Sequence, residues 1–227
     1  MRSFKKVCLV MNDNSYAGRE YAKALQDSKI FPDIILLGSN NAVDSDEDWR
    51  CGNKWKPIGQ DEFSKKISIY KFDSLQDPLL ISHLEKSKYS LGIQGGTGIL
   101  KDIHFEHFAE GMVSFHPGDL PFYRGCSAPE YQVSDGRPVT STCHFIAEGI
   151  DVGDIIDKRV LELDMSSFFS FRSTIYPRTA EFVVDIISRW LSGDELERTP
   201  QNETEATYYK YIGDDEILKM MNSWQYD

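Results

Sequence analysis

The sequence predicts an α/β protein with a largely parallel sheet, and three segments carry the prediction. Residues 5–11 contain a short apolar run, residues 12–18 are polar, and residues 19–27 have the apolar spacing of a short helix. A strand, a loop and a helix in this order open a βαβ unit. The continuous aliphatic run at 33–38 is typical of a parallel strand that is covered on both faces.

Predicted strands and helices alternate along the rest of the chain. Hydrophobic patterns and turn residues predict further strands at 67–70, 89–93, 112–115, 140–146 and 155–163. The same signals predict helices at 77–86, 101–110, 128–133 and 174–191. The chain has 227 residues, of which 41% are hydrophobic, and this is enough for one sizeable core. We therefore expect one domain at 1–200 and a polar C-terminal tail at 201–227 that packs on it.

The charge balance and the apolar runs narrow the range of partners. The net charge is -11 and no basic stripe is present, so the surface would repel a phosphate backbone. Nucleic acid is therefore not an expected partner. The N-terminal apolar run at 7–11 is far shorter than a signal sequence or a membrane span. We expect a cytoplasmic protein without a membrane partner.

Two groups of residues stand apart from the strand and helix pattern. The four cysteines lack the spacing of a zinc site or a disulfide framework, so we expect reduced thiols, mostly buried, and no metal; they are Cys8, Cys51, Cys126 and Cys143. The acidic loop at 40–63 carries Trp49 and Trp55. These two rings either cap the core or line a recognition surface.

His116 stands at the end of the predicted strand 112–115, immediately before Pro117. A proline cannot donate to a central ladder and restricts the residue before it, so the strand should stop at the histidine. His116 then either binds a backbone carbonyl in the tight turn or faces the space that the loops enclose. Three glycines in 95–98, after strand 89–93, would let a ligand approach the backbone at the same edge of the sheet.

Four segments, in this order, resemble the folate-dependent formyltransferases: SLGIQGGTGIL, VSFHPGDLPFYRG, TCHFIAEGIDVGDII and RTPQNETEATYY. This family includes glycinamide ribonucleotide formyltransferase, the catalytic domain of methionyl-tRNA formyltransferase and the sugar N-formyltransferases. The resemblance spans 90–209. It implies a Rossmann-like, largely parallel sheet with helices on both faces. It also implies transfer of the formyl group of N10-formyltetrahydrofolate to an amine.

The family's catalytic trio is asparagine, histidine and aspartate, and the resemblance places Ser114, His116 and Asp151 on these positions. Attack of an amine on a formyl carbon develops an oxyanion and releases a proton. We expect a charged His116 to donate to the oxyanion, and Asp151 to keep the imidazole charged and accept a proton. Ser114 would supply a shorter donor than an amide. A folate-binding homologue with little or no catalysis and a hydrolase that releases formate are the alternatives.

The resemblance also indicates where the two substrates bind. The pterin of the folate is expected against seven residues of the glycine-rich strand end and the turn at 146–151: Gly96, Thr97, Gly98, Ile99, Leu100, Ile146 and Gly149. The turn of Tyr123, Arg124 and Gly125 is most similar in its motif to the sugar N-formyltransferases. We therefore expect a nucleotide-linked amino sugar as the acceptor, with a small amine of the glycinamide ribonucleotide kind as the alternative.

Several features of the acceptor stay open at this point. Arg124, a turn residue, either meets a phosphate or pairs with a carboxylate. The length and acidity of the chain argue against a methionyl-tRNA substrate. Trp49, Trp55 and the tyrosines at 208–211 are candidate stacking surfaces for a nucleotide base. A homodimer is compatible with the resemblance, and the sequence does not determine the oligomeric state.

Overall fold

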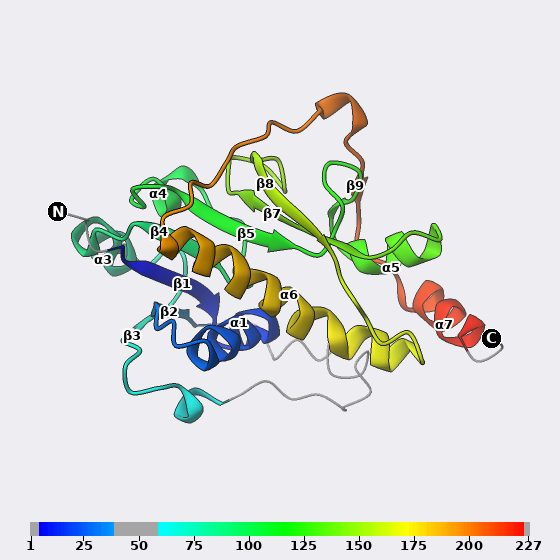
Figure 1. The fold of residues 1–227 in the computed structure, drawn as a ribbon, viewed down its shortest axis with the longest axis horizontal. Coiled ribbons are helices and arrows are strands. Elements are labelled where there is room, and N and C mark those ends of the chain that lie inside the picture. Colours follow the sequence, from blue (N-terminus) through cyan, green and yellow to red (C-terminus); the bar gives the residue numbers. More distant parts are fainter. Residues whose placement is uncertain (1–4, 39–58, 225–227) are drawn as a thin grey trace.

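A seven-stranded sheet forms the centre of the protein in a computed structural model that describes residues 5–38 and 59–224 (Figure 1). The strand order is β3-β2-β1-β4-β5-β7-β8. The first five of these pair in parallel, whereas β7 and β8 are antiparallel additions. The strands are β1 (Val7–Asn12), β2 (Asp33–Leu37), β3 (Ile69–Phe72), β4 (Leu91–Gln94), β5 (Met112–His116), β7 (Thr140–Phe145) and β8 (Ile155–Val160).

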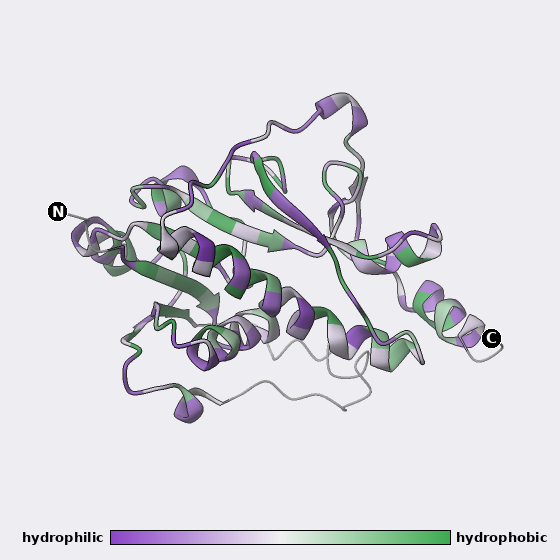
Figure 2. Ribbon diagram, in the orientation of Figure 1, coloured by the Kyte–Doolittle hydropathy of each residue, from purple (hydrophilic) through white to green (hydrophobic). Residues whose placement is uncertain are grey.

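Helices cover both faces of the sheet, as the resemblance implied. Helices α1 (Tyr16–Asp27) and α6 (Phe168–Ser192) pack together on one face, where they meet Leu9 and Met11 of β1. Helix α3 (Pro78–Ser87) covers the other face, against Cys8 and Val10 of the same strand. Alternate residues of a strand point to opposite faces, so β1 is buried on both sides. Figure 2 shows β1 as apolar along its length, while α6 alternates between apolar and polar residues.

Two predicted helices have different bounds in the structure. The helix predicted at 101–110 is the single turn α4 (Asp102–Phe105). The backbone amides of Ala109 and Glu110 donate to the carbonyls of Tyr89 and Ser90, so this segment already follows the edge of β4 on its way to β5. Helix α6 begins earlier than predicted because the hydroxyl of Ser167 accepts the amide of Ser170 and caps it.

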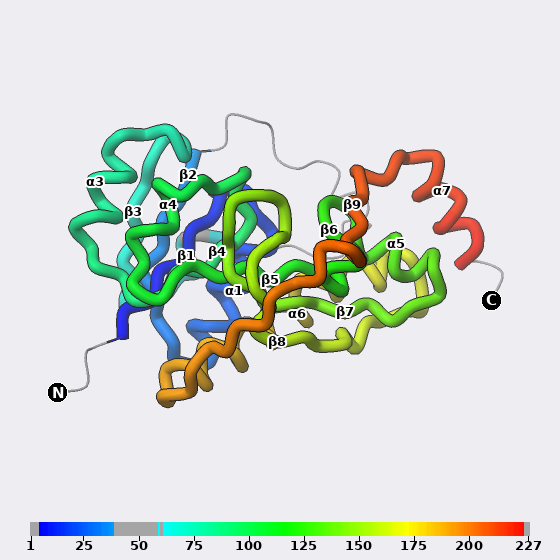
Figure 3. The backbone as a smooth tube through the Cα atoms, turned by 90° about the horizontal axis from the view of Figure 1, so that it is seen from above, coloured from blue at the N-terminus to red at the C-terminus, as the bar shows by residue number. Residues whose placement is uncertain are grey.

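The C-terminal tail contains more structure than its polarity predicts. It forms the short strand β9 (Tyr208–Tyr209), which pairs with β6 (Arg124–Gly125), and the helix α7 (Asp214–Ser223). The buried side chains of α7 pack against the N-terminal part of α6 and against α5 (Ala128–Ser134); they include Ile217 and Met220. Before β9, residues 194–207 cross over the edge of the sheet as the orange segment of Figure 3.

Cys8 and Cys143 are buried and Cys126 is exposed, and all three are free thiols. Cys51 and the two tryptophans at 49 and 55 lie outside the described residues. Among the described residues, no helix is both long and apolar enough to cross a membrane. The same residues contain no group of three side chains suited to a metal ion.

Candidate active site

His116 is the last residue of β5, and its side chain lies on the face of the sheet opposite α1 and α6. Val113 and Phe115 pack into the core below α6, so Ser114 and His116 project the other way. Across the sheet, Ser114 is in register with Gln94 of β4 on one side and with His144 of β7 on the other. The sheet therefore brings four polar side chains to the same end of neighbouring strands.

The imidazole of His116 is buried; one ring nitrogen is hydrogen-bonded and the other faces a carboxylate. Nε2 lies 2.6 Å from the carbonyl oxygen of Tyr123. A carbonyl oxygen can only accept, so Nε2 carries a hydrogen. Nδ1 faces Asp151, with 3.6 Å to the carboxylate Oδ2. His116 thus satisfies both sequence-based alternatives, because one nitrogen binds the turn and the other faces the predicted acid.

Asp151 is held in the turn between β7 and β8. Its backbone has φ 55°, a left-handed conformation that is uncommon outside glycine. The carboxylate Oδ2 accepts the backbone amide of Gly125 at 2.8 Å. The sequence-based expectation that this carboxylate lies one side chain away from His116 agrees with the 3.6 Å separation.

The turn that follows His116 is pinned by a buried glutamine that sequence reasoning did not single out. Gln132 of α5 donates to the carbonyls of Pro117 and Ala128 and accepts the amides of Asp119 and Thr140. Its amide group therefore uses two donors and two acceptor positions within the fold. This network fixes the direction in which the His116 side chain leaves the strand.

His144 is the second site residue that the sequence analysis missed. Its side chain is 4% exposed, and Nε2 lies 3.7 Å from Asp151 Oδ1. Nδ1 is 2.8 Å from the carbonyl of Phe145 and therefore carries a hydrogen. Burial lowers the pKa of His144 to about 4, although the nearby Asp151 acts in the opposite direction. At neutral pH Nε2 therefore has a free lone pair, and it has no hydrogen-bond partner within the described residues.

The neutral state of His144 makes stability depend on pH. Its pKa in the folded protein, about 4, lies below the value of 6.5 for an ordinary histidine, so the unfolded chain binds the proton more readily. The free energy of unfolding should thus fall as the pH drops from 7 towards 4. We expect wild type to lose about 2 kcal/mol more than His144→Asn between pH 7 and pH 5, measured by urea denaturation. Equal losses in the two proteins would show that His144 is not held neutral.

A pocket of about 240 Å³ opens beside Asp151 and His144. It is lined by Gln94, Thr97, Gly98, Ile99, Leu100, His144, Ile146, Ala147, Gly149, Ile150, Asp151 and Val152. Six of the seven residues expected to hold the pterin are in this set. The seventh, Gly96, lies against Ser15 instead: a Cβ on Gly96 would be 2.2 Å from Ser15 Oγ. Gly96 therefore allows the strand end to pack on the start of α1.

A second pocket, of about 120 Å³, lies beside His116. Its lining includes His116, Gly125, Arg172, Tyr176 and Tyr211. Asp151 lines the first pocket and His116 lines the second, and the two side chains are 3.6 Å apart. The His116–Asp151 pair thus stands between two pockets. The guanidinium of Arg172 is buried and forms an ion pair with Glu130 at 2.8 Å.

The three residues expected to contact the acceptor have roles within the fold. Arg124 is fully buried and pairs with Glu203, so the carboxylate alternative describes its position. The hydroxyl of Tyr123 donates to Asp135 at 2.8 Å, and its backbone carbonyl accepts a hydrogen bond from Nε2 of His116. Gly125 has φ 93° and donates its amide to Asp151. These residues support the His116–Asp151 pair, and only Gly125 lines a pocket beside it.

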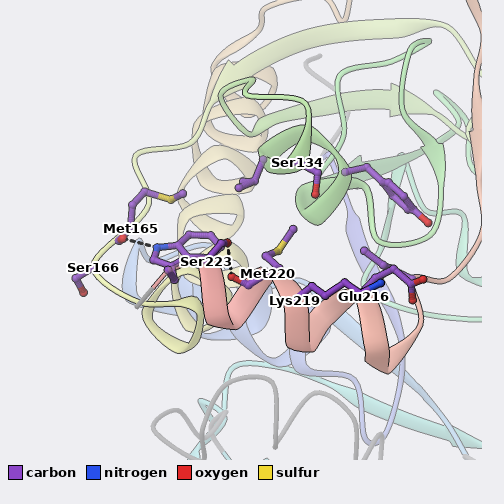
Figure 4. A pocket seen from close by; sticks show the side chains of 11 residues that line it. Ser134, Met165, Ser166, Glu216, Lys219, Met220 and Ser223 are labelled. Carbon is purple, nitrogen blue, oxygen red and sulfur yellow. Dashed lines mark hydrogen bonds between the residues drawn. The ribbon is translucent and has the colours of Figure 1, made fainter. Parts of the chain in front are cut away.

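A larger pocket, of about 940 Å³, lies away from this site (Figure 4). It is bounded by α5, α7 and the loop before α6, and its lining includes Ser134, Met165, Lys219 and Met220. The indole Nε1 of Trp224 donates to the carbonyl of Met165 at one end of it. No residue expected in the active site lines this pocket.

Comparisons with known proteins agree with the fold. No protein-family model matches the chain. Methionyl-tRNA formyltransferase of Syntrophomonas wolfei is 25% identical over 173 residues, which cover 74% of this chain and 55% of the relative. The same enzyme of Fervidobacterium nodosum is 30% identical over 159 residues, or 69% of this chain and 50% of the relative. The chain therefore spans about half the length of these curated relatives.

The fold itself matches solved formyltransferases. The N-formyltransferase of Helicobacter canadensis, in complex with folinic acid and dTDP-3-aminofucose, superposes with a TM-score of 0.63 at 17% identity. The match covers 91% of this chain and 71% of that one. The largely parallel sheet with helices on both faces is therefore a formyltransferase fold. The sequence relatives and the fold together show that the chain belongs to the folate-dependent formyltransferase family.

Proposed function

We propose that this protein transfers the formyl group of N10-formyltetrahydrofolate to an amine, and that the amine belongs to a nucleotide-linked amino sugar. The observation that carries the proposal is the His116–Asp151 pair between two pockets, with Nδ1 and Oδ2 3.6 Å apart. One pocket is lined by six of the residues expected to hold the pterin of the donor. The other is open to an acceptor on the opposite side of the pair.

The two side chains have complementary chemical roles in this proposal. The amine nitrogen attacks the formyl carbon, the carbonyl oxygen becomes negatively charged, and the bond to the folate nitrogen then breaks. Because Nε2–H of His116 is committed to Tyr123, Nδ1–H is the group that can donate to the oxyanion. Asp151 accepts the proton that the attacking nitrogen loses, directly or through water, and the folate nitrogen takes up a proton as it leaves.

Ser114 and Gln94 are the candidates for a second donor to the oxyanion. They are in register on adjacent strands, and the side chain of Gln94 lines the pocket beside Asp151. The Gln94 amide donates to Thr97 Oγ1 at 2.9 Å, so it is already directed towards the glycine-rich strand end. An amide at either position extends further than the hydroxyl of Ser114.

Ser114→Asn should raise the rate of formyl transfer. The longer side chain would place an amide donor beside His116, and one such donor contributes about 3 kcal/mol to the transition state of acyl transfer. We expect an increase in kcat of about tenfold or more, with little change in the KM for the folate. Steady-state kinetics of Ser114→Asn, Ser114→Ala and wild type would measure this. A lower kcat in Ser114→Asn than in Ser114→Ala would contradict a donor role at position 114.

The acceptor is proposed from the second pocket and from the comparisons. Arg172 and two tyrosines line that pocket, and such side chains suit the hydroxyl and phosphate groups of a nucleotide-linked sugar. A structural neighbour was solved with dTDP-3-aminofucose. The similarity to methionyl-tRNA formyltransferases favours a second candidate, a tRNA-linked amine. The net charge of -11 favours the sugar over a polyanion such as tRNA.

The proposal is tested by following tetrahydrofolate release from N10-formyltetrahydrofolate. The acceptor panel contains nucleotide-linked 3- and 4-amino sugars, glycinamide ribonucleotide and methionyl-tRNA, and one reaction contains no acceptor. Release that depends on one amino sugar supports the proposal. Release only with glycinamide ribonucleotide or only with methionyl-tRNA would show that this molecule, and not an amino sugar, is the acceptor. Release without any acceptor would indicate hydrolysis. Binding of folinic acid without turnover in any reaction would identify a folate-binding homologue.

A further inference from the structure

A segment of the C-terminal tail contacts the turn that carries Asp151. We call residues 199–209 the strap. It begins at Thr199, whose backbone amide and carbonyl both bond to Ile155 at the start of β8, and ends at β9, which pairs with β6. The strap thus joins the turn of Asp151 to the turn of Gly125, two segments that are distant in sequence (Figure 3).

Gln201 is the strap residue that contacts both turns. Its Nε2 donates to the carbonyl of Asp151 at 2.8 Å and to the carbonyl of Gly153 at 2.7 Å. Its Oε1 accepts Nε and Nη2 of Arg124 at 3.1 and 2.8 Å. One amide group therefore uses both its donors and its acceptor to connect the two turns.

Arg124 holds Gln201 in place through the hydrogen bonds to its Oε1. Its guanidinium is completely buried and makes a bidentate pair with Glu203, at 2.8 and 2.6 Å, and a hydrogen bond to the hydroxyl of Tyr208. A planar, bidentate pair restricts the orientation of the arginine. Arg124 directly precedes Gly125, whose amide binds the carboxylate of Asp151. Both the backbone and the carboxylate of Asp151 are thus tied to the same network.

We infer that Gln201 is a positioning residue for Asp151, and that Arg124 and Glu203 hold Gln201 in place. The left-handed backbone of Asp151 is strained for a residue with a side chain, and two carbonyls next to it need donors. Gln201 supplies them. Without it, the turn can relax and the carboxylate can leave Gly125 and the neighbourhood of His116. The expected effect of Gln201 on kcat rests on the proposed function, whereas its expected effect on the position of the Asp151 carboxylate does not.

The amide of Gly125 is a direct reporter of where the carboxylate lies. In the wild-type protein, the Gly125 amide donates to Asp151 Oδ2. The next amide, that of Cys126, donates to the carbonyl of Tyr209 and therefore reports the pairing of β6 with β9. Hydrogen exchange of the ¹⁵N-labelled full chain measures both. In Gln201→Ala we expect Gly125 to exchange about tenfold faster or more, with Cys126 changed less than about twofold.

Two further variants refine the test. Gln201→Glu keeps an acceptor for Arg124 but presents no donor to the two carbonyls, so it should also free Gly125 if Gln201→Ala does not fold. Glu203→Gln weakens the support of Arg124 and should give a smaller effect. Glu205→Gln is the matched control, because Glu205 is exposed, lies in the same short helix of the strap, and forms no ion pair among the described residues. It should leave the exchange of Gly125 unchanged.

The kinetic arm uses N10-formyltetrahydrofolate as the donor and hydroxylamine as a small acceptor. Gln201→Ala should lower kcat about tenfold or more and leave the KM for the folate within about twofold, because no residue of the donor pocket is changed. The inference is overturned if Gly125 exchange is unchanged, if Gly125 and Cys126 accelerate together, or if Gly125 is freed while kcat stays at the wild-type value. If wild type shows no turnover with hydroxylamine or with any acceptor of the panel above, the proposed function fails, and the exchange result still decides whether Gln201 positions Asp151.

Discussion

His116→Asn is expected to lower kcat for formyl transfer by about 10² to 10³-fold. The loss of a single donor to a developing oxyanion has this magnitude in acyl-transfer enzymes. Asparagine removes the imidazole, whose Nδ1 lies 3.6 Å from Asp151 and is the proposed donor to the oxyanion. It also cannot reproduce the bond from Nε2 to the carbonyl of Tyr123 in the same geometry. Single-turnover measurements with N10-formyltetrahydrofolate would separate this loss from any change in binding.

The same experiment on Asp151→Asn tests the other half of the pair. Asparagine still accepts the amide of Gly125, so the turn should remain in place while the proton acceptor is lost. We expect Asp151→Asn to lower kcat by about as much as His116→Asn does. Because the two groups act as a unit, the double variant should lose much less than the sum of the two single losses in activation free energy. The matched control is His107→Asn, on a partly buried histidine outside both pockets. Near-wild-type rates in both site variants would rule out this mechanism.

Gly118→Ala is expected to inactivate the protein through displacement of His116. A Cβ on Gly118 would lie 2.4 Å from His116 Nε2 and 2.5 Å from the carbonyl of Tyr123. These are the two atoms of the hydrogen bond that fixes the imidazole. A ring and a backbone carbonyl cannot move aside as the end of a long side chain can. We therefore expect a fall in kcat of about 10²-fold and a loss of about 1–3 kcal/mol in the free energy of unfolding.

Gly213→Ala is the matched control for this substitution. The added Cβ there meets only the carboxylate end of Glu216, at 2.7 Å, which can rotate away. Its kcat should equal that of wild type. Activity measurements and urea denaturation of both variants would test the comparison. If Gly118→Ala kept full activity, the orientation of His116 by Tyr123 would not matter for the reaction.

Much of the fold was predictable because it depends on short-range patterns. The aliphatic run at 33–38 predicted the buried strand β2, and Pro117 correctly ended β5 at His116. Helix α4 was predicted too long, because the backbone of Ala109 and Glu110 bonds to the edge of β4 rather than to a helix. Such a pairing between distant segments leaves no periodic signal in the sequence. The pairing of β9 with β6 in the tail was missed for the same reason.

The candidate site divides in a similar way between sequence and structure. The family resemblance pointed to His116, Asp151 and six residues that line the pocket of about 240 Å³, because each belongs to a short segment with distinctive glycines and prolines. The sequence offered one signal for His144, its place two residues before the turn of 146–151, whereas its position opposite Ser114 is known only from the pairing of β5 with β7.

The sequence by itself indicated the groups on which the proposed chemistry rests: a histidine at a strand end, an acid in a glycine-rich turn and a glycine-rich strand end. Only the tertiary structure decided how these groups are held. Arg124, which the sequence left between a phosphate and a carboxylate, is buried against Glu203, and Gln201 crosses from the tail to Asp151. The reason is physical. A reactive group can be recognised from local spacing, whereas its orientation depends on hydrogen bonds between segments that only folding brings together.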